Sequence, residues 1–265
     1  MNNLAPATEL APTDNLSPLG FSLIGRTALV TGAAGGTGRA ITSALVAAGA
    51  TRVLGWDRVA DDSPNVEGMV IDLSDTADVE RALAELDEVP EIIVNAAGFY
   101  ANRPTFDVET SDFRRTLDIN LTSPYIIQRE IGRRLIAENR QGAFINIASV
   151  AGKHAFGNQV DYSASKAGLI GLTRAAALDL APNITVNGIA PGTVDTPMIS
   201  KVIADVAAVT GLSLEEQREA FIGSIPTKRM QQPNEIAAAV VFLASVAARS
   251  ITGEVLNVDG GSTRD

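Results

Sequence analysis

Residues 27–40 read TALVTGAAGGTGRA, and this stretch decides the fold of the 265-residue chain. Its first residues are apolar or β-branched and predict a short buried strand. A glycine-rich turn follows, and then AITSALVAAG (40–49) has the composition of a helix. A strand that passes into a helix through glycines is the first half of a βαβ unit. We therefore expect a parallel sheet.

The same alternation continues to the end of the chain. Further strands are predicted over residues 51–57, 68–73, 91–98, 143–149, 184–192 and 254–261, and further helices over 78–89, 111–138, 162–181 and 233–245. The strands are continuous apolar runs, which is typical of a parallel sheet covered by helices on both faces. The prediction is an α/β fold with one doubly wound parallel sheet of about seven strands, in a single domain over residues 23–265.

Residues 1–22 differ from the rest of the chain. They contain Pro6, Pro12 and Pro18 among small polar residues, which predicts a mobile N-terminal arm. An arm ordered against a neighbouring subunit is the alternative. This stretch lacks the basic start and apolar core of a signal peptide, and the apolar runs are too short to span a bilayer. We expect a soluble, cytoplasmic protein.

Composition excludes several classes of function. Lys and Arg number 21 against 31 Asp and Glu, for a net charge of −10, which argues against nucleic-acid and anionic-membrane partners. The chain has no cysteine and one histidine, His154. Thiolate nucleophiles, zinc–sulfur sites, iron–sulfur clusters and histidine-rich metal sites are therefore excluded, and we expect no metal site.

The glycine-rich turn is suited to binding a pyrophosphate. Glycines let the backbone approach the anion closely, and the free N–H groups at the helix start face it. The spacing is Gly-x-x-x-Gly-x-Gly and differs from the Gly-x-Gly-x-x-Gly dinucleotide fingerprint. The residues expected to contact the cofactor here are Gly32, Ala34, Gly36, Thr37 and Gly38.

Asp57 ends the second predicted strand, 19 residues after Gly38. A carboxylate at this place can accept hydrogen bonds from the adenosine ribose and repels a 2′-phosphate, which favours NAD over NADP. Arg58 argues the other way, for NADP, because an arginine can bind a 2′-phosphate. Asp57 carries more weight because the strand end fixes its position and because residues 33–35 include no basic side chain. The alternative for Asp57 is a solvated loop charge.

Tyr162 and Lys166 lie one helical turn apart on a predicted helix. A free tyrosine has a pKa of about 10, and a nearby ammonium group lowers it. Such a tyrosine can exchange the proton of an alcohol or ketone near neutral pH. Ser149 ends a predicted strand, where its hydroxyl can hydrogen-bond a substrate oxygen. A serine that only caps a turn is the alternative.

Together these residues resemble the short-chain dehydrogenase/reductase family, in its shorter-subunit, single-domain branch. The matching motifs are TGAAGGTG (31–38), DL (72–73), NAAG (95–98), Asn120 in LDINLTSPY, Ser149, YSASK (162–166), PGTVDT (191–196) and ITGEVLNVDGG (251–261). The resemblance covers about residues 25–261. It implies a Rossmann-like fold and an NAD(H)-dependent oxidoreductase that interconverts a secondary alcohol and a ketone.

The resemblance also implies a role for each matched residue. Tyr162 is expected to be the general acid/base, and Lys166 to lower its pKa and hold the nicotinamide ribose. Ser149 is expected to orient the substrate carbonyl, and Asn120 to kink its helix and hold a proton-relaying water. The other implied cofactor contacts are Asp72 and Leu73 at the adenine, Asn95 by the adenosine ribose, and Pro191, Val194 and Thr196 around the carboxamide.

Residues 198–230 are expected to form a substrate lid of two short helices, 199–211 and 213–223. Their apolar faces could cover a small substrate and exclude water. The apolar residues concerned are Val202, Ile203, Val206, Phe221 and Ile222. Packing onto the domain is the alternative, and both can hold together.

Three further side chains lie on loops that could border the pocket. His154, five residues after Ser149, is a candidate substrate contact, with loop packing as the alternative. Arg103 and Lys153 prompt the hypothesis that the substrate carries a carboxylate. Solvated surface charge is the alternative for both.

Several functions remain open. The leading one is an NAD(H)-dependent oxidoreductase acting on a small polar or cyclic substrate. The alternatives are an NADPH-dependent 3-oxoacyl-thioester reductase, which Asp57 opposes, a non-catalytic dinucleotide-binding protein, and a lyase or epimerase using bound NAD. The resemblance further implies a homotetramer assembled through the helices at 111–138 and 162–181.

Overall fold

The computed structural model describes residues 20–263. The predicted arm, residues 1–22, lies outside the described residues except for its last three. Among these, the Phe21 ring packs edge-on against Phe242 of α8 (Pro233–Ala244), with ring centroids 6.0 Å apart. Leu23, the next apolar residue, is fully buried. The packed domain therefore includes Phe21 and Leu23.

The described chain contains a sheet of seven parallel strands in the order β3-β2-β1-β4-β5-β6-β7. The strands are β1 (Thr27–Thr31), β2 (Arg52–Asp57), β3 (Glu67–Val70), β4 (Ile92–Asn95), β5 (Gly142–Ile147), β6 (Ile184–Pro191) and β7 (Val255–Val258). The chain builds outward from β1 to β3 and then crosses to β4 on the other side of β1. In such sheets, ligands bind at the carboxyl ends of the strands where the order reverses. The predicted doubly wound fold is confirmed.

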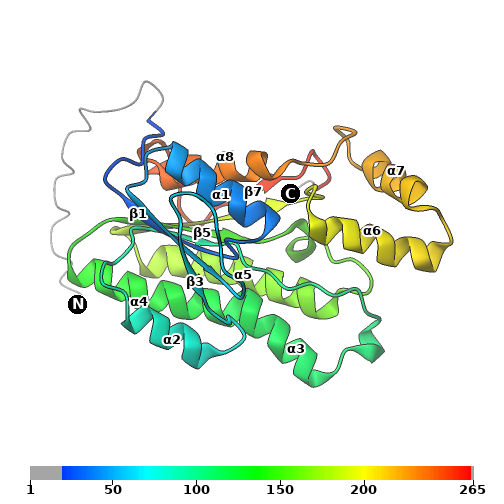
Figure 1. Ribbon diagram of the computed structural model, residues 1–265, viewed down its shortest axis with the longest axis horizontal. Helices are drawn as coiled ribbons and strands as arrows, with labels where there is room; N and C mark the ends of the chain where they lie inside the picture. Colours follow the sequence, from blue (N-terminus) through cyan, green and yellow to red (C-terminus); the bar gives the residue numbers. More distant parts are fainter. Residues whose placement is uncertain (1–19, 264–265) are drawn as a thin grey trace.

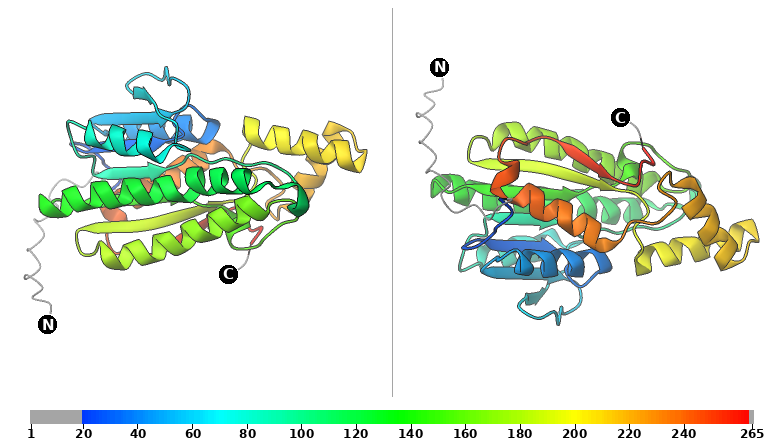
Figure 2. Two further views of the ribbon diagram at one scale, coloured as in Figure 1. Left: turned by 90° about the horizontal axis from the view of Figure 1, so that it is seen from below. Right: turned by 90° about the horizontal axis from the view of Figure 1, so that it is seen from above.

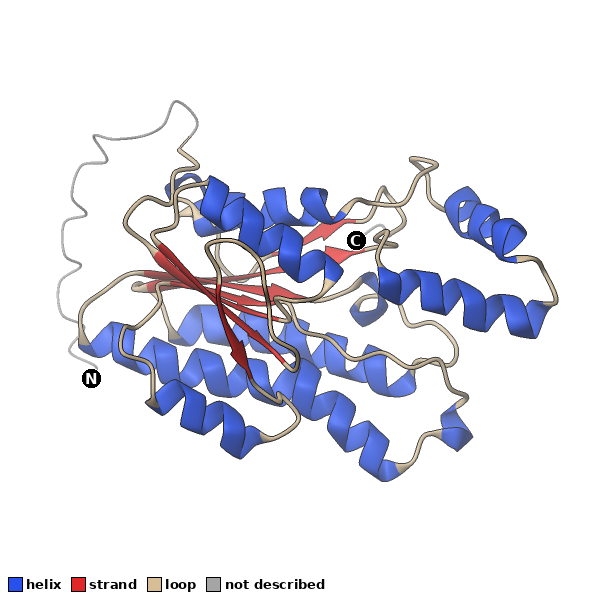
Figure 3. Ribbon diagram, in the orientation of Figure 1, coloured by secondary structure: helices blue, strands red, loops and turns tan. Residues whose placement is uncertain are grey.

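Helices cover both faces of the sheet (Figures 1 and 3). On one face lie α1 (Gly36–Ala47) and α8, and on the other α2 (Thr76–Ala84), α4 (Ser123–Ala137) and α5 (Val160–Asp179). Alternate side chains of a strand point to opposite faces. In β1, Ala28 and Val30 join the apolar cluster under α1 and α8, and Leu29 joins the cluster under α4. Because both faces are buried, the strands need the continuous apolar runs seen in the sequence.

The helix predicted over residues 111–138 is interrupted in its first half. α3 (Thr110–Leu117) runs into a π-helical turn, Asp118–Thr122, before α4 begins. Asn120 lies in this turn and is fully buried. Its side chain accepts a hydrogen bond from the Phe99 N–H (2.8 Å) and donates one to the Phe99 carbonyl (3.0 Å). Single π turns inside helices commonly mark functional sites, and this one lies where a kink was expected at Asn120.

Two helices, α6 (Pro197–Thr210) and α7 (Leu214–Ser224), project beyond the end of the sheet (Figure 2). They occupy the segment predicted as the lid. Ile203, Ile225 and Met230 form a small apolar cluster there, with Phe221 and Ile222 packed against it. Within residues 20–263, no single helix is long and apolar enough to cross a membrane; α6 and α7 meet that test only together, across a bend of 110°.

Candidate active site

The turn between β1 and α1 can be built only with glycine at its tightest points. Gly32 has a φ of +71°, and a Cβ there would lie 2.7 Å from the Ala97 Cα. A Cβ on Gly38 would lie 1.9 Å from the Gly32 carbonyl oxygen. Distances this short exclude any side chain, so the backbone itself forms the surface of the turn.

The start of α1 fits an anion. Its N-cap, Gly35, provides no side-chain hydrogen bond, and the first turn contains no acidic residue. The first N–H groups of a helix have no partner within the helix, and with the helix dipole they attract a phosphate. Ala34 and Thr37 lie in the same turn. These residues therefore fit the pyrophosphate of a dinucleotide cofactor.

Asp57 lies beside this turn, at the carboxyl end of β2. Its carboxylate accepts hydrogen bonds from the Ala34 N–H (3.1 Å) and from the Val59 N–H (3.4 Å). These contacts fix the carboxylate next to the phosphate-binding turn, where a ribose of the cofactor would follow the pyrophosphate. Arg58 is exposed.

A second cation near the turn, Arg39, has its charge compensated. It donates to the carboxylate of Asp62 at 2.9 Å and to the Ala34 carbonyl at 3.0 Å, and lies 3.6 Å from the carboxylate of Asp61. Arg39 is thus engaged by two aspartates, which weakens its capacity to bind a 2′-phosphate.

Asp72 and Leu73 follow β3 along the edge next to Asp57. The Asp72 carboxylate accepts hydrogen bonds from the Ser74 hydroxyl (2.7 Å) and N–H (2.9 Å). These bonds, and then the charges of Arg115 and Arg58, lower the pKa of Asp72. Leu73 is buried and its carbonyl accepts from Ser123. The loop is therefore fixed at the place where the adenine is expected.

Asn95 has a partner that the sequence did not reveal. Its side-chain amide donates to Asn146 of β5 at 2.8 Å, and Gln128 and Thr173 complete a buried network with Asn146. The network ties β4 and β5 to α4 and α5. Because the Asn95 side chain is buried, only the main chain of this residue is left to contact a cofactor.

The four predicted catalytic residues converge at the carboxyl edge of the sheet. Ser149 follows β5, and its hydroxyl accepts from the Ala151 N–H at 3.1 Å. It lies close enough to the phenol of Tyr162, in the first turn of α5, to lower the pKa of that phenol. Lys166, one turn further, is buried, and its ammonium donates to the Ile147 carbonyl at 2.7 Å. The Lys166 nitrogen and the Asn120 oxygen both border Gly98, within about 4 Å of where its Cβ would stand.

Burial dominates the proton affinities of this group. It raises the pKa of the Tyr162 phenol, an effect that the hydrogen bond with Ser149 offsets in part, and it lowers the pKa of Lys166 to about 8. Lys166 was expected to lower the Tyr162 pKa. The net shift of the Tyr162 pKa in this structure is upward because burial outweighs the hydrogen bond with Ser149, and the Lys166 ammonium donates to a carbonyl and not to the phenol. At neutral pH Tyr162 is therefore a proton donor.

The turn after β6 meets the phosphate-binding turn. β6 ends at Pro191, and Thr196 caps the start of α6. A Cβ on Gly36 would lie 3.2 Å from the Thr196 side chain, so the two turns are in contact. Val194 packs against the apolar cluster under α1 and α8, and its carbonyl accepts from the Thr196 hydroxyl at 3.3 Å. One dinucleotide can therefore reach both turns.

Two residues that support the carboxamide turn were not predicted. The main chain of Gln231 accepts from the Asp195 N–H (2.8 Å) and donates to the Thr193 carbonyl (2.9 Å). Arg218 of α7 donates to the Asp195 carboxylate at 2.9 Å and so ties α7 to this turn. Both side chains of that ion pair are about a third exposed, so its contribution to stability is small. Neither Gln231 nor Arg218 belongs to a motif by which the sequence could reveal it.

The three side chains expected near the pocket behave differently. His154 is exposed in the loop after Ser149. Lys153 donates to the Val255 carbonyl of β7 at 3.0 Å. Arg103 forms ion pairs with two aspartates, Asp112 and Asp161. Lys153 and Arg103 therefore both have partners within the protein, and this weakens the hypothesis that they bind a carboxylate of the substrate.

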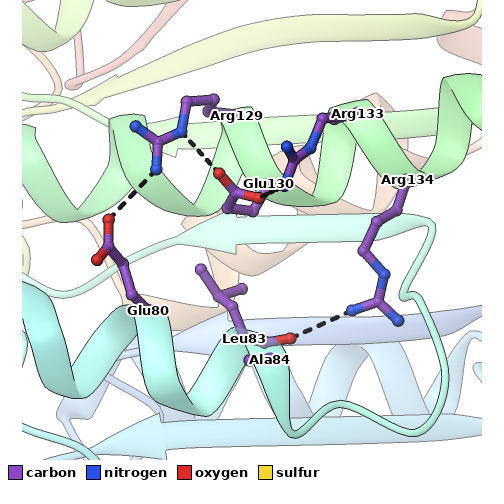
Figure 4. A pocket seen from close by; sticks show the side chains of 7 residues that line it. All are labelled: Glu80, Leu83, Ala84, Arg129, Glu130, Arg133 and Arg134. Carbon is purple, nitrogen blue, oxygen red and sulfur yellow. Dashed lines mark hydrogen bonds and ion pairs between the residues drawn. The ribbon is translucent and has the colours of Figure 1, made fainter.

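A hollow of about 400 Å³ lies between α2 and α4 (Figure 4). It contains ion pairs of Arg129 with Glu80 and Glu130, and Arg134 donates to the Leu83 carbonyl. The residues that line it come from α2 and α4, and none of them belongs to the catalytic group. The hollow is thus separate from the catalytic group. No cluster of possible metal ligands occurs in residues 20–263.

Comparison with known proteins agrees with this geometry. A family model described as enoyl-(acyl carrier protein) reductase matches residues 32–263. Nodulation protein G of Rhizobium sp. is 37% identical over 253 residues, covering 91% of this chain and 98% of the relative. The 3-oxoacyl-[acyl-carrier-protein] reductase of Vibrio harveyi is 35% identical with the same coverage. The chain belongs to the short-chain dehydrogenase/reductase family.

Solved structures of this family share the fold over nearly the full length. One, described as an NAD(P)-dependent gluconate 5-dehydrogenase from Beutenbergia cavernae with bound NADP, superposes with a TM-score of 0.84 at 35% identity, covering 92% of this chain and 98% of that one. A 4-hydroxyisoleucine dehydrogenase in complex with NADH gives 0.81 at 28% identity, with 90% and 98% covered. The chain is therefore a dinucleotide-binding oxidoreductase of the CH–OH/C=O type.

The lowered pKa of Lys166 predicts a pH limit on activity. Below pH 8 the side chain is an ammonium, and above it the charge is lost, whereas Tyr162 stays protonated beyond its usual pKa of about 10. We expect kcat/KM for ketone reduction to fall as pH rises through about 8.

The control for this prediction is Lys166→Arg, whose guanidinium stays charged over the whole range. Whatever its absolute rate, the fall in its profile should move to higher pH. A fall at the same pH in both proteins would contradict the assignment of the limit to Lys166.

Proposed function

We propose that this protein is an NAD(H)-dependent oxidoreductase that interconverts a secondary alcohol and a ketone on a small polar or cyclic substrate. The observation that carries the proposal is the convergence of Tyr162, Ser149 and Lys166 beside a turn suited to a dinucleotide. The bound nicotinamide supplies or accepts the hydride.

The side chains of this chain do the rest of the chemistry. In reduction, the Tyr162 phenol gives its proton to the substrate oxygen as hydride reaches the carbon, and in oxidation the phenolate takes that proton back. The Ser149 hydroxyl, which lies beside the Tyr162 phenol, orients the same oxygen. The Lys166 ammonium, held by the Ile147 carbonyl, holds the nicotinamide ribose. The Asn120 turn holds a water that returns protons to Lys166.

The preference for NAD rests on Asp57. Its carboxylate is fixed beside the phosphate-binding turn by the Ala34 N–H, and it repels a 2′-phosphate. Gly35 is the residue directly before α1, so no basic side chain is offered from that position. The remaining cofactor contacts we propose are those of the sequence analysis: the phosphate-binding turn, Asp72 and Leu73, and the carboxamide turn.

A second candidate is an NADPH-dependent 3-oxoacyl-thioester reductase. It is supported by relatives named 3-oxoacyl-[acyl-carrier-protein] reductase at 34–36% identity. Asp57 opposes it. Cofactor preference therefore separates the two candidates.

We also propose a cytoplasmic homotetramer built through α4 and α5. Support comes from the outer face of α5, where Ala164, Ala167, Gly171 and Leu178 form an exposed stripe of small and apolar residues. Leu178 is 81% exposed in the single chain. A smooth face of this kind suits close helix packing against a second copy. The net charge of −10 supports neither nucleic acid nor membrane as a partner.

The experiment that tests the proposed chemistry is Tyr162→Phe. We expect the loss of about 10²–10⁴-fold in turnover that removal of a general acid/base causes, with the Kd for NAD changed less than threefold. Tyr125→Phe, at a half-exposed position on α4, is the matched control and should keep its rate. Turnover of alcohols or ketones by Tyr162→Phe at the wild-type rate would exclude the proposed mechanism.

The cofactor preference is tested by Asp57→Ala. Removing the carboxylate removes the repulsion of the 2′-phosphate, so calorimetry should show NAD binding weakened and NADP binding strengthened, with the ratio of the two Kd values moving at least tenfold. Asp87→Asn, a surface carboxylate paired with Arg52 near the other end of β2, is the control and should leave the ratio unchanged. Tighter binding of NADP than NAD by the wild type would favour the thioester reductase.

The assembly is tested by Gly171→Arg. A charged side chain on the outer face of α5 cannot be buried between two copies without a partner, so light scattering after gel filtration should show a smaller particle than the wild type. Ala77→Arg, an equally exposed position on α2, should leave the mass unchanged. An unaltered tetramer in Gly171→Arg would place the interface elsewhere.

A further inference from the structure

A second tyrosine shares the catalytic group. Tyr100 follows the NAAG turn, and its ring packs edge-on against the Tyr162 ring, with centroids 5.2 Å apart and planes at 88°. It is only partly buried, so a ligand that reaches the Tyr162 ring can also meet Tyr100. None of the motifs in the sequence includes Tyr100.

The loop that carries Tyr100 is held on both sides. The Phe99 N–H and carbonyl are both bonded to the Asn120 side chain, at 2.8 and 3.0 Å. On the other side, the Arg103 N–H donates to the Asn158 carbonyl at 3.0 Å. Groups fixed in this way before binding lose little freedom when a ligand arrives. Tyr100 is therefore a preorganised part of the site.

The Tyr100 hydroxyl has hydrogen-bonding capacity left to use. Its oxygen accepts from the Gln159 amide at 3.5 Å, the long limit for a hydrogen bond, and within residues 20–263 its proton has no acceptor. Burial raises the pKa of Tyr100; the hydrogen bond from Gln159 offsets this in part, and the nearby charges of Asp205 and Asp161 add to the rise. The hydroxyl therefore stays protonated and acts as a donor.

We propose that Tyr100 is a substrate-recognition residue whose hydroxyl donates a hydrogen bond to a second oxygen carried beside the reacting carbon. The substrate class is then a vicinal diol or the matching α-hydroxyketone. Tyr162 alone exchanges the proton of the reacting oxygen, the hydride passes between the reacting carbon and the nicotinamide, and Tyr100 keeps its own proton throughout. This inference rests on the proposed function and adds the substrate class.

The preference has a physical reason. A bound alcohol with one oxygen would bury the Tyr100 hydroxyl and leave its proton without an acceptor, which costs free energy. Sites built to hydrogen-bond a substrate group discriminate strongly against analogues that lack it. A diol pairs with this hydroxyl and avoids that cost.

The test compares butane-2,3-diol with butan-2-ol, each as a mixture of stereoisomers, by NADH formation. The wild type should show a kcat/KM at least tenfold higher for the diol. Tyr100→Phe keeps the ring against Tyr162 and removes only the hydroxyl, so it should lose at least tenfold on the diol and less than threefold on butan-2-ol. Tyr125→Phe is the control and should match the wild type on both.

The outcomes separate this inference from the proposed function. Equal efficiency on both probes in the wild type, an unchanged preference in Tyr100→Phe, or oxidation of neither probe by protein that binds NAD would each overturn the role of Tyr100. The proposed function fails instead if the protein does not bind NAD, or if Tyr162→Phe retains wild-type turnover of any alcohol or ketone.

Discussion

The site depends on one close approach of backbone to backbone. At the switch point between β1 and β4, the Gly32 turn passes so near Ala97 that a Cβ at Gly32 would lie 2.7 Å from its Cα. This contact sets the phosphate-binding turn against the NAAG turn, from which the loop carrying Tyr100 departs. Asp57 enters from β2 on one side, and Ser149 enters from the far side of β4. The strand order thus collects these residues at one edge without a second domain.

Desolvation is the second constraint. Burial raises the pKa of Tyr162 and lowers the pKa of Lys166, and so favours the neutral form of each side chain. The polar contacts that compensate are few: the Ile147 carbonyl for Lys166, and Ser149 for Tyr162. Because these groups have few hydrogen-bond partners within the protein, they can form further hydrogen bonds with cofactor and substrate. The Tyr100 hydroxyl can do the same.

Much of this could be predicted from sequence because it depends on local pattern. Continuous apolar strands separated by helices predicted the doubly wound sheet, and the glycines at 32, 36 and 38 predicted the turn whose steric requirement the structure shows. Tyr162 and Lys166 are one helical turn apart, so their proximity followed from the helix alone. The irregularity expected at Asn120 came from the family resemblance, and a π turn lies there.

The rest depends on contacts between distant segments. The partners of Arg103 and Lys153 come from elements that only the topology brings near, and they removed support for a carboxylate substrate. The direction of the Tyr162 pKa shift depends on burial, which residue spacing does not report. Tyr100 and Gln231 lie in loops and Arg218 lies in α7, and none of the three belongs to a motif.

The central claim is that the carboxyl edge of the sheet at the switch point binds NAD and carries the chemistry. The most direct measurement is a crystal structure of the protein grown with NAD. We predict density for the dinucleotide across the β1–β4 edge, with its pyrophosphate at the start of α1, its adenosine ribose hydrogen-bonded to Asp57 and its nicotinamide beside Tyr162. A dinucleotide bound elsewhere, or one whose nicotinamide lies out of reach of Tyr162, would contradict the account.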